Sequence, residues 1–155
     1  MHTTDTKLEK LEFTKRNWEL LTSFPDDGFM IVLPYLLDFL FSIETQIQSI
    51  ELIIPIIDKL GTSKGRQIIG TKIAPLFELE KRHDLIHALI DCKLVFNLLE
   101  RLGLSYVIDF IFPCLFRSLR CPDMVVSERG GRTIFQFGLA NIIFFFSIIF
   151  FINFF

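Results

Sequence analysis

The chain has 155 residues, a formal net charge of −2 and a hydrophobic fraction of 51%, with a mean hydropathy of +0.48. This length suits one domain with a continuous core. The sequence lacks a dense basic run, which argues against nucleic acid as a partner. Its polar N-terminus shows no cleaved signal peptide. The cysteines, Cys92, Cys114 and Cys121, form no C-x-x-C pair and are expected to be reduced packing residues of a cytosolic chain.

The first expected element is a helix over residues 8–24. Leu11, Trp18 and Leu21 are among its apolar positions, and it ends before the turn signal Pro25-Asp26-Asp27-Gly28. We interpret residues 1–27 as a capping helix and turn at the exposed end of a helical stack.

Prolines then recur inside apolar helical segments, at Pro34, Pro75 and Pro113. Their spacing is about 40 residues, a period typical of HEAT and armadillo units. A Leu-Gly pair recurs with the same period at Gly61 and Gly103. The first helices of the expected hairpins span 28–41, 64–80 and 105–120, and each is bent at its proline because proline removes a backbone hydrogen bond.

The second helices of the hairpins are expected over 42–60 and 84–102. Apolar side chains recur there at helical spacing, and a glycine suited to a left-handed conformation follows each helix. The apolar positions are Ile43, Ile47, Ile50, Ile54 and Ile57, and then Leu85, Leu89, Cys92, Val95, Phe96, Leu99 and Leu102. The sequence therefore predicts an all-α fold of HEAT/armadillo-like hairpins, about 2.5 repeats over 28–120, followed by a polar linker over 121–132.

The tail over 133–155 contains no charged residue and follows Arg129 and Arg132. About 20 apolar residues span a bilayer, so this tail, from Thr133 to Phe155, is a candidate membrane anchor with the N-terminus in the cytosol. The alternative is that the Phe- and Ile-rich tail is translated non-coding sequence, because such residues are encoded by A- and T-rich DNA.

Two patterns resemble functional motifs. His83 and His87 lie four apart, with Asp91 and Cys92 a turn further on, which is a spacing that can seat zinc. A solvated histidine pair is the favoured interpretation, because no third ligand can be assigned. Gly65-x4-Gly70-Thr71-Lys72 resembles a phosphate-binding loop, but Lys and Thr stand in the wrong order and no strand precedes it. We therefore assign no catalytic, cofactor-binding or metal-binding residue.

Basic side chains gather near the entrance of one expected hairpin, at Lys64, Arg66 and Lys72. They are a candidate contact for an acidic partner or a lipid headgroup. A membrane-directed patch usually holds about 4 to 8 such residues, so a solubilising role is the favoured interpretation.

The phrases LPYLLDFL, ELIIPIIDKLG, IAPLFE and LVFNLLERLGLSYVIDFIFPCLFRSL lie between about residues 29 and 120. This stretch resembles the helical repeats between the BEACH and WD-repeat parts of the WD repeat-containing protein 81 family. The resemblance implies a large scaffold on endosomal and autophagic membranes that restrains phosphoinositide 3-kinase signalling and handles ubiquitinated cargo. The chain has no room for a BEACH domain or a propeller, so no functional residue is carried over.

The sequence therefore predicts a non-catalytic scaffold, a fragment of a larger protein of endosomal or autophagic trafficking. Its partners would be proteins bound through helix faces, and no cofactor or small-molecule substrate is expected. Localisation would be cytoplasmic or on endosomal membranes. The alternatives are a small tail-anchored membrane protein and a metal-dependent enzyme around His83 and His87.

Overall fold

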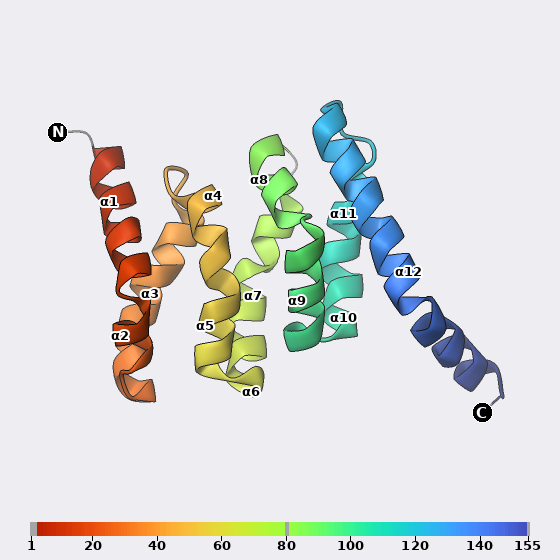
Figure 1. Ribbon diagram of the computed structural model, residues 1–155, viewed down its shortest axis with the longest axis horizontal. Helices are drawn as coiled ribbons and strands as arrows, with labels where there is room; N and C mark the ends of the chain where they lie inside the picture. The colour runs from red at the N-terminus through yellow and green to blue at the C-terminus, as the bar shows by residue number, and fades with distance from the viewer. Residues whose placement is uncertain (1–2, 80, 155) are drawn as a thin grey trace. The chain divides into compact units, whose positions relative to one another are not determined.

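The computed structural model of the chain (Figure 1) describes the backbone of residues 3–79 and 81–154, and the side chains of these ranges except 3–5, 62, 139–152 and 154. Within this described part the chain is all-helical and contains no strand, which confirms the predicted class. It divides into two compact units, Met1–Ile73 and Ala74–Phe155.

The N-terminal unit combines helices with short 3-10 and π turns. In chain order these are α1 (Thr3–Arg16), α2 (Trp18–Thr22), α3 (Asp26–Phe41), α4 (Gln46–Ser49), the 3-10 turn η1 (Ile50–Leu52), α5 (Ile53–Leu60), α6 (Thr62–Lys64), the π turn η2 (Gly65–Gly70) and α7 (Thr71–Ile73). The helix predicted over 8–24 thus forms as α1 and α2, and α3 forms close to the predicted 28–41.

The sequence of α3 explains its start and its buried face. Asp26 and Asp27 occupy the first turn, where acidic side chains complement the positive end of the helix dipole. Apolar side chains three and four apart are buried: Phe29, Leu33, Leu36, Phe39 and Leu40. Beyond the helix, the buried hydroxyls of Thr45 and Ser49 both donate to the Phe39 carbonyl, at 2.8 and 3.0 Å. These bonds connect the end of α3 to α4.

The helix predicted over 42–60 forms as α4, η1 and α5, and its buried face differs from the predicted one. Ile43 is 74% exposed, whereas the buried side chains are Ile50, Leu52, Ile53, Ile56 and Ile57. η1 has 3-10 geometry, in which each residue turns further about the helix axis than in an α-helix. Ile43 itself is exposed because it lies in the turn before α4. The predicted stripe is therefore confirmed at Ile50 and Ile57 and wrong at Ile43.

The C-terminal unit contains the 3-10 turn η3 (Ala74–Glu78), α8 (His83–Leu89), α9 (Cys92–Leu102), α10 (Leu104–Tyr106), the π turn η4 (Val107–Ile111), α11 (Phe112–Ser118) and α12 (Met124–Phe154). The helix predicted over 84–102 is interrupted between α8 and α9. Asp91 precedes α9, and its carboxylate accepts a hydrogen bond from the Leu94 N–H at 3.2 Å. This cap starts a new helix where we expected a continuous one.

The polar linker predicted over 121–132 is replaced by helix from Met124 onward. The Asp123 carboxylate accepts from the Val125 N–H at 3.0 Å, at the helix start. α12 packs on α8, α9 and α11, and the buried positions among its described side chains are Val126, Gly130, Thr133 and Phe137. Burial of this spaced face stabilises helix in a segment that we predicted to be a polar linker.

Two of the recurring prolines follow a π turn. Pro75 lies shortly after η2 and Pro113 shortly after η4, whereas Pro34 lies in the interior of α3. Proline lacks an N–H and its ring collides with the carbonyl one turn earlier. A π turn shifts the hydrogen-bond register and so accommodates the proline. The helices predicted over 64–80 and 105–120 are therefore divided into short pieces.

The predicted glycine stops are confirmed as positive-φ positions, in a conformation other than the expected one. Gly61 has φ 84° and ψ 165°, and Gly103 has φ 91° and ψ 165°. Each glycine N–H closes the preceding helix, on the Ile57 carbonyl at 2.9 Å and the Leu99 carbonyl at 3.0 Å. This extended positive-φ region is open almost only to glycine, and here it allows the next helix to begin at once.

Candidate functional site

An open groove of about 580 Å³ lies in the N-terminal unit between α1–α2 and α3. It is lined by Thr6, Glu9, Lys10, Phe13, Thr14, Asn17, Leu20, Leu21, Val32, Tyr35, Leu36 and Phe39. Figure 1 shows that α1 and α2 run in the direction opposite to α3, so the groove follows a pair of antiparallel helices.

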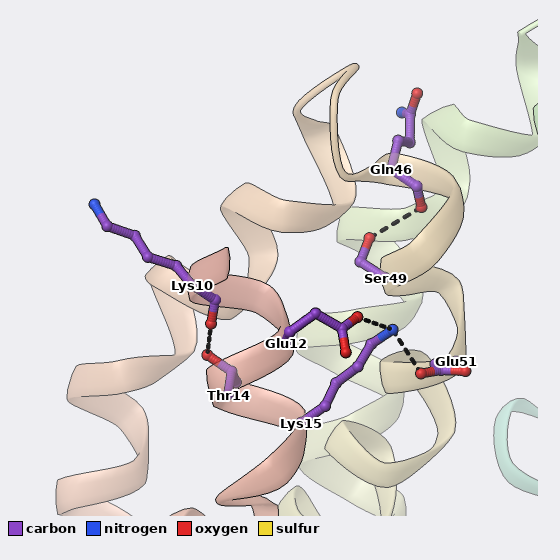
Figure 2. Close-up of polar contacts among 7 residues, drawn as sticks. All are labelled: Lys10, Glu12, Thr14, Lys15, Gln46, Ser49 and Glu51. Carbon is purple, nitrogen blue, oxygen red and sulfur yellow. Dashed lines mark hydrogen bonds and ion pairs between the residues drawn. The ribbon is translucent and has the colours of Figure 1, made fainter. Parts of the chain in front are cut away.

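Separate faces of α1 build the core and the groove. Leu11 is fully buried, and Lys7 and Lys15 lie one turn to either side of it. Lys7 donates to the Ser42 hydroxyl at 2.9 Å, and Lys15 pairs with Glu51 at 2.7 Å. Figure 2 shows Lys15 directed toward Glu51, while Lys10 extends from the other side of α1. The inward face is therefore tied to the end of α3 and to η1, and the other face is left to line the groove.

Lys59 fixes the turn between α2 and α3, at the end of the groove. Its ammonium donates to the Phe24 carbonyl at 2.9 Å, lies 4.0 Å from the Asp26 carboxylate and 5.8 Å from the ring centroid of Phe29. Phe29 also makes an edge contact with Trp18, with centroids 6.3 Å apart. These contacts hold the two walls of the groove at a set separation.

The groove combines a buried floor with exposed aromatic and aliphatic walls. Leu36 and Phe39 belong to the buried core, whereas Phe13, Leu20 and Tyr35 are 68%, 60% and 70% exposed. The charged groups in the lining are one acid, Glu9, and one base, Lys10, so the groove carries almost no net charge. An occupant would be selected by apolar shape more than by charge.

Sequence reasoning missed this groove. We identified Leu11, Trp18 and Leu21 among the apolar positions of the first helix, of which Leu21 lines the groove, but we passed over Phe13 and Leu20. These two lie seven residues apart and hence on one helical face. This second apolar stripe on the helix predicted over 8–24 was the sequence signal that could have revealed the groove.

The histidine pair lies on α8, and its neighbours have structural roles. The Asp91 carboxylate caps α9 and lies 3.9 Å from Arg129, and the His87 carbonyl accepts from Arg129 at 2.9 Å. Burial, and then the nearby Asp91, raise the pKa of the Cys92 thiol. In the part of the chain that the structure describes, no group of three His, Cys, Asp or Glu side chains is placed to hold a metal ion.

The glycines of the loop-like pattern lie in helix. Gly65 and Gly70 are the first and last residues of η2 and are buried, and an added Cβ on Gly65 would come within 2.8 Å of Ile57 Cγ2. Gly65 thus allows η2 to approach α5 closely. The basic side chains Lys64, Arg66 and Lys72 are exposed on this segment.

Of the candidate anchor residues, Thr133 is buried and its hydroxyl donates to the Ile90 carbonyl at 2.6 Å, whereas Phe155 lies outside the described residues. Most side chains of the predicted anchor over 133–155 are likewise not described. A search of the described residues finds no helix with the length and apolar character needed to cross a membrane.

No protein-family profile matches the chain, and no solved structure matches it. A Dictyostelium discoideum protein named as a probable inactive serine/threonine-protein kinase, lvsG, is 26% identical to it over 120 residues. The match covers 77% of this chain and 6% of that protein. The chain is therefore similar to a short stretch of a much longer protein.

Proposed function

We propose that the chain is a non-catalytic, HEAT-like scaffold segment that binds an amphipathic helix of a protein partner in the groove between α1–α2 and α3. The observation that carries the proposal is the groove itself, whose walls expose Phe13, Leu20 and Tyr35 over a buried apolar floor. Exposed apolar surface gathered in one concave site is typical of a binding surface.

The HEAT-like part of the proposal is supported by a repeated local geometry. Gly61 and Gly103 have nearly the same φ and ψ. Each is followed by a short helix, then by a π turn, η2 or η4, and then by a proline, Pro75 or Pro113. Two stretches with the same order of unusual backbone features are expected of two copies of one repeat unit.

A helix is the occupant that best suits this groove. α1 has 14 residues, so the groove beside it extends about 20 Å, the length of a short amphipathic helix. Such a helix places apolar side chains at i, i+3, i+4 and i+7 into an apolar groove. The polar groups along the groove, Thr6, Thr14 and Asn17, would face its polar flanks.

The match to 6% of a longer protein supports a place within a larger scaffold. In a solenoid, each hairpin is covered by the next, and the outer face of a terminal hairpin is apolar unless it is capped. A role in endosomal or autophagic trafficking, and a cytoplasmic or endosomal location, rest on the resemblance to the WD repeat-containing protein 81 family and belong to the proposal.

The test uses a display library of helical peptides of about five turns, with Leu, Phe or Met at i, i+3, i+4 and i+7 and neutral residues elsewhere. Peptides selected on the full chain are then measured by fluorescence anisotropy against Phe13→Glu and Tyr35→Glu. We expect each substitution to weaken binding at least about tenfold, because it places a charge in an apolar contact.

Ile43→Glu is the matched control, since Ile43 is 74% exposed in the same unit and does not line the groove. Equal loss of binding in Ile43→Glu and Phe13→Glu, or no selected peptide, would contradict the proposal. The proposal would also be contradicted if the full chain forms a dimer in sedimentation and Phe13→Glu dissociates that dimer, because the groove would then be filled by a second copy.

A second candidate function, a tail-anchored membrane protein, is favoured by one observation: α12 continues as helix to Phe154 through a stretch without charged residues. The test appends a glycosylation site after Phe155 and compares the full chain with a version ending at Gly138, which retains the buried positions Val126, Gly130, Thr133 and Phe137. Glycosylation together with carbonate-resistant membrane binding of the full chain alone supports an anchor. An unmodified, extractable full chain rules it out.

A further inference from the structure

A second cavity lies in the C-terminal unit, where α8 begins and α11 ends. Its volume is about 260 Å³, and the charged or titratable side chains in its wall include Arg117, Arg120 and His83. Among the lining residues that the structure describes, none is Asp or Glu. A small cavity lined by two arginines, with no carboxylate among its described lining residues, concentrates positive potential and favours an anion.

Arg117 is held in position from one side. One of its N–H groups donates to the carbonyl of Phe77, in η3. A guanidinium has five N–H donors in a planar fork, so this bond orients the group and leaves donors for a ligand. Arg117 and Cys114 both line the cavity, and the Arg117 charge opposes the effect of burial, which raises the pKa of the Cys114 thiol.

Two carboxylates close to the cavity in sequence are engaged elsewhere. Asp84 accepts two hydrogen bonds from Arg82, at 3.1 and 3.2 Å, and Asp123 accepts from the Val125 N–H. Among the residues that the structure describes, neither Arg117 nor Arg120 forms an ion pair. These two cations lie three residues apart in sequence, Arg117 within α11 and Arg120 just after it, and an anion between them would be attracted to both.

The dimensions and walls of the cavity limit the class of anion. Its volume of about 260 Å³ is smaller than the roughly 300–1,000 Å³ of pockets for drug-sized ligands. Leu79, Ile86 and Pro122 supply apolar wall beside the charged groups, which suits a small anion carrying a short carbon group. Guanidinium forks match phosphate oxygens in bidentate pairs.

We propose that this cavity binds the phosphoryl group of a phosphate monoester, with Arg117 and Arg120 on its oxygens and a ring N–H of His83 as a further donor. The monoester is either a free small molecule or a phosphorylated side chain of a protein, and the two sources share this chemistry. The cavity is separate from the apolar groove, so the test of this proposal is independent of the test of the proposed function.

The test titrates the full chain with inorganic phosphate, glycerol 3-phosphate and a phosphoserine peptide, and follows backbone amides by two-dimensional NMR. We expect saturable shifts at His83 and Arg120. Arg120→Gln should weaken binding about tenfold or more, because it removes a charge-assisted contact. Arg120 is exposed, so this substitution is expected to leave the fold intact.

Arg132→Gln is the matched control, since it removes the same charge from an exposed position of α12 outside the cavity. If the phosphoserine peptide binds more tightly than glycerol 3-phosphate, the natural ligand is assigned to a phosphorylated protein. If the two bind equally, it is assigned to a free phosphate ester. Both results support the site. The proposal is overturned if no probe shifts these amides, if Arg132→Gln weakens binding as much as Arg120→Gln, or if acetate and the unphosphorylated peptide bind equally well.

Discussion

Replacing Gly130 by alanine tests the close approach of α12 to α11. Gly130 is buried against Ser118, whose hydroxyl donates to the Leu115 carbonyl at 2.5 Å. A Cβ added at Gly130 would overlap the Ser118 Oγ and would lie 3.1 Å from the Ser118 Cβ. The adjacent Gly131 is a matched control, because its added Cβ would make an ordinary contact with Leu119, at 3.6 Å.

Two effects of opposite sign set the magnitude. Alanine is favoured over glycine inside a helix by about 1 kcal/mol, and both positions gain this amount. Overpacking of a buried contact costs about 1–3 kcal/mol, and only Gly130 bears this cost. The Gly130→Ala variant is therefore expected to be less stable than Gly131→Ala by about 1–3 kcal/mol.

The measurement has to report on the C-terminal unit, because Trp18, the sole tryptophan, belongs to the N-terminal unit. Hydrogen exchange of the buried amides of α12 under native conditions meets this need. Ser118→Ala should reduce the cost of Gly130→Ala, since it removes the overlapping hydroxyl. Equal exchange in the Gly130 and Gly131 variants would refute the packing of α12 on α11 that we describe.

Further predictions follow from the same structure. Gly103→Ala should destabilise the chain by about 1–3 kcal/mol, because φ is 91° there; denaturant unfolding should show no comparable loss for Gly138→Ala, whose added Cβ meets open space. Thr133→Val should cost about 1–2 kcal/mol, because it leaves the Ile90 carbonyl without its buried donor, and an unchanged unfolding midpoint would contradict this. Burial raises the pKa of the Cys114 thiol, so its thiolate is scarcer at neutral pH; mass spectrometry should show slower alkylation than at Cys121, with the rate at Cys114 increasing as pH rises toward its raised pKa.

Much of the fold could be predicted because its signals are local. The helix over 28–41 was predicted from the apolar segment around Pro34 and from the turn signal before it, and the stops at Gly61 and Gly103 were predicted from single residues that tolerate positive φ. Where a local feature was subtle, prediction failed. The helix predicted from residue 42 begins only at Gln46, which leaves Ile43 in an exposed turn, and the Asp91 cap divided the helix over 84–102.

The candidate sites could not be predicted in the same way. The groove depends on which face of α1 packs inward, and that choice is made by the contacts of Lys7, Leu11 and Lys15 with residues far away in the chain. The charged cavity likewise joins η3, the start of α8 and the end of α11, so Arg117 and His83 become neighbours only through packing.

The sequence by itself determined the helical class, the period of the prolines and the glycine-terminated helix ends, because each depends on the backbone preferences of a few adjacent residues. Only the tertiary structure decided that residues 124–132 are helix, since the stabilising contacts of Val126 and Gly130 come from packing on other helices. It alone also decided which apolar side chains remain exposed, because exposure depends on every helix packed nearby and not on the spacing within one.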